Sequence, residues 1–113
     1  MPSQCLFCRI IAGEIPAGIV AQNEHCVACR DINPQAPIHI LIIPREHIPS
    51  LNEARDATVL GRMQLLAAEL AKSHGLAERG YRTVINTNAD AGQTVFHIHL
   101  HLIGGRTMTW PPG

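Results

Sequence analysis

The sequence predicts an α+β fold in which a five-stranded antiparallel sheet packs with one long helix and one short helix. Five segments have the length and apolar pattern of strands, and turn-rich segments separate them. One longer segment repeats its apolar residues with the period of an α-helix. Strands joined by hairpins together with a long helix are typical of this class. The 113 residues correspond to one domain, which we place at residues 1–113.

The first half of the chain is expected to form a short helix and three strands, at residues 5–13, 19–22, 25–30 and 38–44. The helical pattern ends at Gly13, and glycine is common just past the end of a helix. Asn23-Glu24 favours a tight hairpin turn between the first two strands. The third strand is almost entirely apolar, which indicates burial on both faces.

The second half is expected to form the long helix and two further strands, at residues 56–73, 81–86 and 95–102. Apolar residues spaced three or four apart give the helix one apolar face, made by Val59, Met63, Leu66 and Leu70. Asp56 or Asn52 can cap its start. Gly75 is expected to end it.

Composition limits the function classes. Lys plus Arg equals Asp plus Glu, and the absence of a basic stripe argues against a nucleic-acid partner. Residues 1–4 have no signal-peptide pattern, and no apolar run reaches transmembrane length. We therefore expect no membrane association and a cytoplasmic location. The four cysteines are then expected to be thiols or metal ligands rather than disulfides.

Three histidines alternate with aliphatic residues near the C-terminus, at His97, His99 and His101. Alternate side chains of a strand share one face, so three imidazoles point one way while Ile98 and Leu100 can enter a core. Residues 86–94, just before, supply backbone N–H groups, amides and hydroxyls, which suit an anionic ligand such as a phosphate.

From the residues alone, three interpretations of these histidines remain open. They are partly exposed strand residues without a special role, or ligands of a metal ion. In the third interpretation one of them is a nucleophile. A neutral imidazole attacks phosphorus near pH 7, and the covalent intermediate replaces one difficult displacement by two easier ones.

The cysteines form two pairs, Cys5-x-x-Cys8 and Cys26-x-x-Cys29, with the spacing of a four-cysteine zinc site. Cys26 and Cys29 lie three apart in an expected strand and therefore point to opposite faces. They cannot bind one ion together, so we expect both to be small buried side chains.

The sequence resembles the histidine-triad (HIT) family. The resemblance covers nearly the whole chain and is carried by His-x-His-x-His at residues 97–101, residues 31–39, Asn86, Gly92-Gln93-Thr94, Gly104-Gly105-Arg106 and Trp110-Pro111-Pro112-Gly113. Gly104-Gly105-Arg106 and the tail resemble the nucleoside phosphoramidase branch. The branch that cleaves dinucleoside polyphosphates usually has Pro-Arg after the triad, and the nucleotidyltransferases have a His-Pro-His core.

This resemblance implies a HIT-like sheet extended across a homodimer and hydrolysis of purine nucleoside phosphoramidates, with no metal or cofactor required for catalysis. It makes His99 the nucleophile and places His101 against the phosphate. His97 and His39 would support the site from behind, and Thr94, with Gln93, would hold the leaving-group side. Trp110 would lie near the partner's site.

The nucleotide-binding residues implied by the resemblance are Ile10, Ile15, Cys29, Asp31, Ile32, Asn86, Gly92, Gln93, Thr94, His99 and His101. Asp31 would bind the ribose hydroxyls, because a carboxylate accepts two hydrogen bonds from a diol. The sequence departs from the branch at Thr94, where Ser is more frequent, and at Cys29, where an aromatic residue is more frequent. The second departure leaves the base preference open.

Some bacterial HIT proteins are similar in a further respect, since they bind a structural zinc ion through an N-terminal Cys-x-x-Cys and two histidines. The corresponding residues here are Cys5, Cys8, His47 and His97. Two thiolates and two imidazoles make a closed tetrahedral site. The alternative is that both cysteines are free thiols and His47 is a surface residue.

Two alternatives to phosphoramidate hydrolysis remain open. One is hydrolysis of dinucleoside polyphosphates by the same triad. The other is a purine-nucleotide-binding or interaction protein that does little chemistry.

Overall fold

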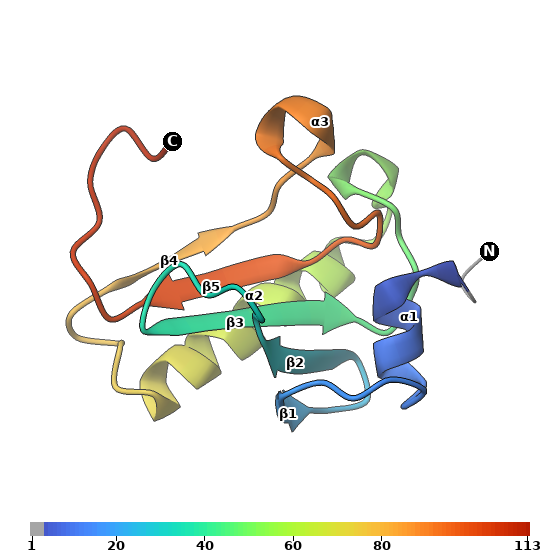
Figure 1. Ribbon diagram of the computed structural model, residues 1–113, viewed down its shortest axis with the longest axis horizontal. Helices are drawn as coiled ribbons and strands as arrows, with labels where there is room; N and C mark the ends of the chain where they lie inside the picture. Colours follow the sequence, from blue (N-terminus) through green and yellow to red (C-terminus); the bar gives the residue numbers. More distant parts are fainter. Residues whose placement is uncertain (1–3) are drawn as a thin grey trace.

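The computed structural model describes residues 4–113 and confirms the α+β fold with a five-stranded antiparallel sheet. Residues 1–3, part of the segment expected to lack a signal peptide, lie outside the described residues. The strand order is β1-β2-β3-β5-β4. In chain order the elements are α1 (Leu6–Ile11), β1 (Ile19–Gln22), β2 (Cys26–Arg30), β3 (Ile38–Pro44), the 3₁₀ helix η2 (Leu51–Glu53), α2 (Ala57–Ser73), β4 (Tyr81–Val84), α3 (Asn88–Ala91) and β5 (Leu100–Gly104) (Figure 1).

Strand β3 lies at the centre of the sheet and is buried on both faces, as its continuous apolar sequence predicts. Ile40 and Ile42 point into the larger core, which α2 covers. Leu41 and Ile43 point to the other face, where they pack with residues of α1. The two helices therefore cover opposite faces of the sheet, with α2 along its length and α1 near the end of β3 (Figure 1).

Helix α2 has the predicted buried face, with Met63, Leu66 and Leu70 in the larger core. Asp56 is its N-cap, and the Asp56 carboxylate accepts a hydrogen bond from the Thr58 backbone N–H at 2.9 Å. Gly75 follows the C-cap with a φ of +75°, a conformation that glycine adopts without strain.

The fifth strand differs from the prediction, since it spans Leu100–Gly104 rather than residues 95–102. The register that pairs Ile42 with Leu100 would pair Pro44 with Ile98. Pro44 has no N–H to donate, and its carbonyl accepts a hydrogen bond from the His97 ring. The Ile98 N–H bonds instead to the carbonyl of Ile48. Residues 95–99 therefore lie outside the ladder.

Other boundaries differ by one or two residues. Strand β4 ends at Val84 rather than at residue 86, and α1 spans six residues because Cys5 is its N-cap. Two short helices, η2 and α3, occupy segments where the sequence predicts none. The number of helices is therefore larger than the predicted two in the described part of the chain.

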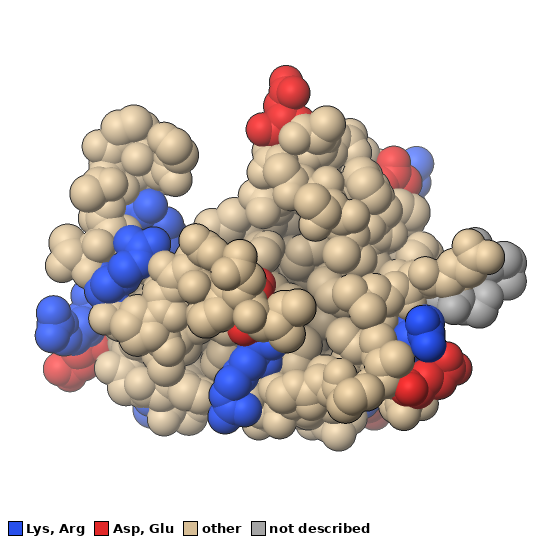
Figure 2. All heavy atoms as spheres, viewed as in Figure 1, with Lys and Arg blue, Asp and Glu red and all other residues tan. Residues whose placement is uncertain are grey.

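The C-terminal segment is fixed to the sheet by arginines. Arg82 donates a hydrogen bond to the Thr109 carbonyl at 2.8 Å and lies 5.8 Å from the centre of the Trp110 ring. Arg106 donates to the Gln35 carbonyl at 2.9 Å. Figure 2 shows basic side chains gathered at this end of the molecule, whereas the centre of the face is mostly uncharged. Within residues 4–113, no helix has both the length and the apolar character needed to cross a membrane.

Candidate active site and metal cluster

The three histidines lie on the sheet face opposite α2, although only His101 belongs to β5. Ile98, Leu100 and Leu102 all enter the larger core, so the predicted alternation holds. The His97 side chain is fully buried, while His99 and His101 are partly exposed. The centres of the His99 and His101 rings are 5.0 Å apart. The row therefore runs from a buried end at His97 to an accessible end at His101.

The hydrogen bond of His99 defines its tautomer. Its Nδ1 atom lies 2.8 Å from the His97 carbonyl oxygen, and a carbonyl only accepts, so Nδ1 carries the hydrogen. Burial lowers the pKa of His99, which keeps the ring neutral near pH 7. The Nε2 atom of the neutral ring then has a free lone pair, as a nucleophile requires.

A second chain of hydrogen bonds defines the tautomers of His39 and His101. The Gln35 backbone N–H donates to Nδ1 of His39 at 3.0 Å, so a neutral His39 carries its hydrogen on Nε2. That atom donates to Nδ1 of His101 at 2.9 Å. His101 therefore carries its hydrogen on Nε2. His99 and His101 thus offer complementary groups, one a bare nitrogen and the other an N–H donor.

The pKa values of these rings support neutral imidazoles. Burial, followed by the neighbouring His99 and His39, lowers the pKa of His101 to about 4. Burial also lowers the pKa of His39, although the nearby Asp31 carboxylate raises it. An oxygen of Asp31 lies 3.4 Å from Nε2 of His39. The chain of rings is therefore uncharged near neutral pH, and its hydrogen positions are fixed.

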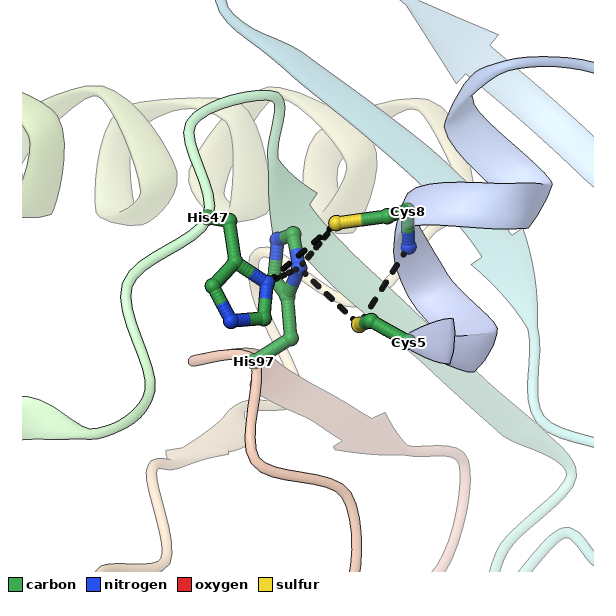
Figure 3. Close-up of side chains that lie close together, drawn as sticks. All are labelled: Cys5, Cys8, His47 and His97. Carbon is green, nitrogen blue, oxygen red and sulfur yellow. Dashed lines mark hydrogen bonds between the residues drawn. The ribbon is translucent and has the colours of Figure 1, made fainter. Parts of the chain in front are cut away.

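Four predicted metal ligands lie together at the buried end of the row. Figure 3 shows that the thiols of Cys5 and Cys8, at the start of α1, point toward His47 and His97. The potential ligand atoms all lie within 4.8 Å of one another. Nδ1 of His97 is 3.5 Å from the Cys5 sulfur, 3.4 Å from the Cys8 sulfur and 3.2 Å from Nδ1 of His47.

These distances fit a tetrahedral zinc site. Ideal Zn–N and Zn–S bonds place two nitrogens about 3.3 Å apart, and a sulfur and a nitrogen about 3.6 Å apart. Nε2–H of His97 donates to the Pro44 carbonyl at 2.8 Å, which leaves Nδ1 of that ring free to bind a metal. Burial and the neighbouring Cys5 raise the pKa of Cys8 to about 11, so metal binding would displace a proton from this thiol.

The other two cysteines lie apart from this cluster. Cys26 belongs to the core beneath α2 and Cys29 to the smaller core on the opposite face, as predicted. Burial raises the pKa of both thiols, which lowers the fraction of the reactive thiolate. A shared four-cysteine site is therefore excluded.

The residues expected near the base and ribose are distributed over several environments. Ile10 and Cys29 are buried in the smaller core and Ile15 packs against it, whereas Ile32 is fully exposed. Asp31 is about one-sixth exposed (17%), and one of its oxygens accepts a hydrogen bond from the Asn33 backbone N–H. The structure thus places Asp31, but not Ile32, in contact with the histidine network.

The residues expected near the phosphate also differ in accessibility. Gly92 and Thr94 are exposed, and Asn86 is partly buried. Gln93 is buried, and its amide bonds only to the backbone. It accepts from the Asn88 N–H and donates to the carbonyls of Pro49 and Val95. The Gln93 side chain therefore holds the loop in place rather than facing outward.

Phe7 is a site residue that the sequence-based prediction missed. Its ring lies edge-on to His99, with centres 4.8 Å apart, and 6.0 Å from the ring of His97. It sits between Cys5 and Cys8 in the chain. That position, an aromatic residue between two potential ligands, is the signal that could have identified it.

Comparison with known proteins places this geometry in context. The HIT domain family model matches residues 12–108. The chain is 50% identical over 110 residues to the purine nucleoside phosphoramidase of Escherichia coli K12, with 96% of this chain and 92% of that protein covered. Its fold is similar to a HIT family hydrolase from Legionella pneumophila, with a TM-score of 0.95 and 53% identity over 97% of this chain and 100% of that chain. A Zn-bound histidine triad family protein from Mycobacterium smegmatis aligns with a TM-score of 0.81 and 36% identity, covering 94% of this chain and 78% of that chain.

Proposed function

This chain belongs to the HIT domain family, and we propose that it is a hydrolase that cleaves the P–N bond of purine nucleoside phosphoramidates. The identity with the E. coli purine nucleoside phosphoramidase supports the substrate class. The observation that carries the proposal is the pairing of tautomers in the site. A bare Nε2 on His99 lies beside an Nε2–H on His101, as attack on a phosphorus with charged oxygens requires.

In the proposed reaction, Nε2 of His99 attacks the α-phosphorus while the P–N bond breaks. The amine takes a proton from solvent water as it leaves, and the water that later attacks the intermediate returns a proton to solvent. Nε2–H of His101 donates a hydrogen bond to the phosphoryl group and stabilises the charge that develops there. Water then attacks the nucleotidyl-His99 intermediate, which releases the nucleoside monophosphate and restores the neutral ring.

The remaining site residues would bind the nucleotide. Asp31 would accept hydrogen bonds from the ribose hydroxyls, for which its partly exposed carboxylate is suited. The exposed Thr94 hydroxyl would donate to the phosphate from the loop before the triad, next to Gly92, Asn86 and Gln93. The purine would pack near Ile10, Ile15, Cys29 and Ile32. His39 would act through His101, whose tautomer it fixes.

We also propose a structural zinc ion held by Cys5, Cys8, His47 and His97. The zinc-bound relative and the fit of the ligand distances support it. When bound, the ion would crosslink α1 to the segment that precedes β5. No step of the proposed reaction uses it, and no other cofactor is required.

A homodimer is the assembly that we propose. Strand β4 forms one edge of the sheet, and an edge strand can pair with the same strand of a second chain. Arg82 of this strand lies beneath Trp110, which is 81% exposed. Pairing through β4 would bring a second chain close to this tryptophan.

The direct test is hydrolysis of a fluorogenic adenosine phosphoramidate by the wild type and by His99→Ala. His25→Ala is the matched control, because His25 lies near Arg62 and away from the triad. We expect the control to retain activity and His99→Ala to lose about 10³-fold or more. Wild-type rates in His99→Ala would refute the covalent mechanism. Faster cleavage of a dinucleoside polyphosphate than of the phosphoramidate would favour the alternative branch. Tight binding of adenosine monophosphate without turnover would favour the binding protein.

A further inference from the structure

The proposed nucleophile lies in a segment that the sheet does not hold. Strand β5 begins at Leu100, so the backbone at residues 97–99 has no ladder partner in β3. A reacting group displaced by about 1 Å can lose about 100-fold in rate. His99 therefore requires restraints other than strand pairing.

We infer that the Cys5/Cys8/His47/His97 cluster, when it holds its metal, positions the ring of His99 for attack. The inference rests on the proposed role of His99 as nucleophile. It makes His97 and Phe7 positioning residues that act through two separate contacts on the same ring.

The first contact is the carbonyl of His97. This carbonyl accepts the hydrogen bond from Nδ1 of His99, and so determines which nitrogen of His99 is bare. The same peptide unit is held from its other side by the hydrogen bond from the Ile98 N–H to the Ile48 carbonyl. The His97 side chain is fully buried within the cluster. His97 therefore supplies both a ligand atom of the cluster and the carbonyl that sets the tautomer of His99.

The second contact is the edge of Phe7. Cys5 and Cys8 flank this residue, so binding of both sulfurs to one ion fixes the turn of α1 that carries it. The ring packs edge-on to His99 at a centre-to-centre distance of 4.8 Å. This contact limits rotation of the imidazole.

The cluster depends on the metal for its order. His97 donates through Nε2, so its Nδ1 presents a lone pair 3.2 Å from Nδ1 of His47. Without an ion, only thiol hydrogens or a proton on His47 can bridge these atoms, and thiols are weak donors. Removing the ion takes away the restraint on Nδ1 of His97, and the ring keeps only its hydrogen bond to Pro44 and its packing. The carbonyl that orients His99 is then held less firmly, by the Ile98 hydrogen bond to Ile48 and the remaining contacts of the ring.

The experiment compares wild-type protein with its zinc bound, removed under reducing conditions, and restored. Selective ¹⁵N labelling of histidine and long-range ¹H–¹⁵N correlation identify the tautomer of His99 in each state. Hydrolysis of the adenosine phosphoramidate gives kcat and KM for the same samples. Cys26→Ala is the matched control, since Cys26 is a buried thiol outside the cluster.

With zinc bound we expect one His99 tautomer, with its hydrogen on Nδ1. Zinc removal is expected to give a mixture of tautomers and to lower kcat by about 10- to 100-fold, more than it changes KM. Restoring zinc reverses both effects, and Cys26→Ala behaves as the wild type in every state. An unchanged tautomer and kcat after zinc removal overturn the inference.

A second variant covers the case in which the zinc-free protein unfolds. Phe7→Leu keeps an apolar side chain between the two cysteines but removes the ring edge. We expect this variant to retain its zinc, to show mixed His99 tautomers and to have a reduced kcat. A single tautomer with wild-type kcat would overturn the inference. If the wild type itself has no hydrolase activity, the proposed function fails, while the tautomer measurement still decides the positioning role.

Discussion

Two polar clusters flank His99 and are built in opposite ways. On one side, Cys5, Cys8, His47 and His97 converge on a point that fits one metal ion, and His97 is fully buried. On the other side, His39 and His101 form a chain of neutral rings that starts at a backbone N–H and ends at an accessible N–H donor. The first cluster suits a rigid crosslink, whereas the second suits interaction with a charged substrate.

The difference shows how one alternating pattern can serve two purposes. The sequence between His97 and His101 repeats the same residue types, yet the two end histidines have different partners because different strands and loops face them. Pro44 and the start of α1 face His97. His39 of β3 faces His101, and Gln35 in the loop before β3 donates a hydrogen bond to His39. If the two clusters are separate, a change in one should leave the other intact.

Outside the proposed nucleophile itself, the largest effect is expected for His101→Ala. Loss of the N–H donor should lower the rate of phosphoramidate hydrolysis by about 10²- to 10⁴-fold, because a positioned donor acts on charge in the transition state. Zinc content should stay unchanged, since His101 has no contact with the four ligands. His101→Gln should recover part of the rate through its amide N–H. Rates near those of the wild type, or loss of zinc in either variant, would contradict the separation of the two clusters.

Removal of the metal from the cysteine and histidine cluster should lower the stability of the fold. A ligand present at about a thousand times its dissociation constant stabilises the folded state by about 4 kcal/mol, and a chelator should abolish that contribution. Urea unfolding with and without a chelator measures it. His101→Ala should lose the same amount as the wild type, while Cys5→Ser should show a smaller response to the chelator. A midpoint that the chelator does not change would exclude the structural metal.

Acid should lower the free energy of unfolding, because the partly buried neutral ring of His101 resists protonation in the folded protein. The pKa of His101 in the folded protein is about 4, below the ordinary value of 6.5, so the unfolded chain binds more protons between these two pH values. Stability from this ring is therefore complete above about pH 6.5 and is lost as the pH falls toward 4, by about 3 kcal/mol in total. Urea unfolding of zinc-free wild type and His101→Gln from pH 7 to pH 4.5 tests this. Parallel pH dependences of the two proteins would contradict it.

Much of the fold follows from local patterns in the sequence. The apolar period of α2, the cap at Asp56 and the continuous apolar run of β3 each determine their element without reference to the rest of the chain. The start of β5 at Leu100 could not be predicted from local patterns. It depends on which residue of β3 faces Ile98, and that residue is Pro44 only because of the register between two strands far apart in sequence.

The candidate site shows the same division. The resemblance to the HIT family named the four residues that converge on the metal position, and the alternation placed three histidines on one face. The tautomers could not be predicted, because they depend on individual donors and acceptors such as the Gln35 N–H and the His97 carbonyl. Gln93 was expected to face the leaving group, yet its amide satisfies backbone groups that only the folded loop brings together.

The smallest effect is expected at the C-terminus, where neither cluster is touched. Trp110 lies over Arg82 of the edge strand and is 81% exposed, so its ring is available to a second chain. Trp110→Ala should change the ratio of kcat/KM between bulky aromatic and small amine leaving groups by less than about 10-fold, and should leave the maximal rate nearly unchanged. Sedimentation of the same samples gives the oligomeric state. A dimeric variant with unaltered preference would show that Trp110 does not contribute to specificity, and a monomeric wild type would exclude a contribution from the partner subunit.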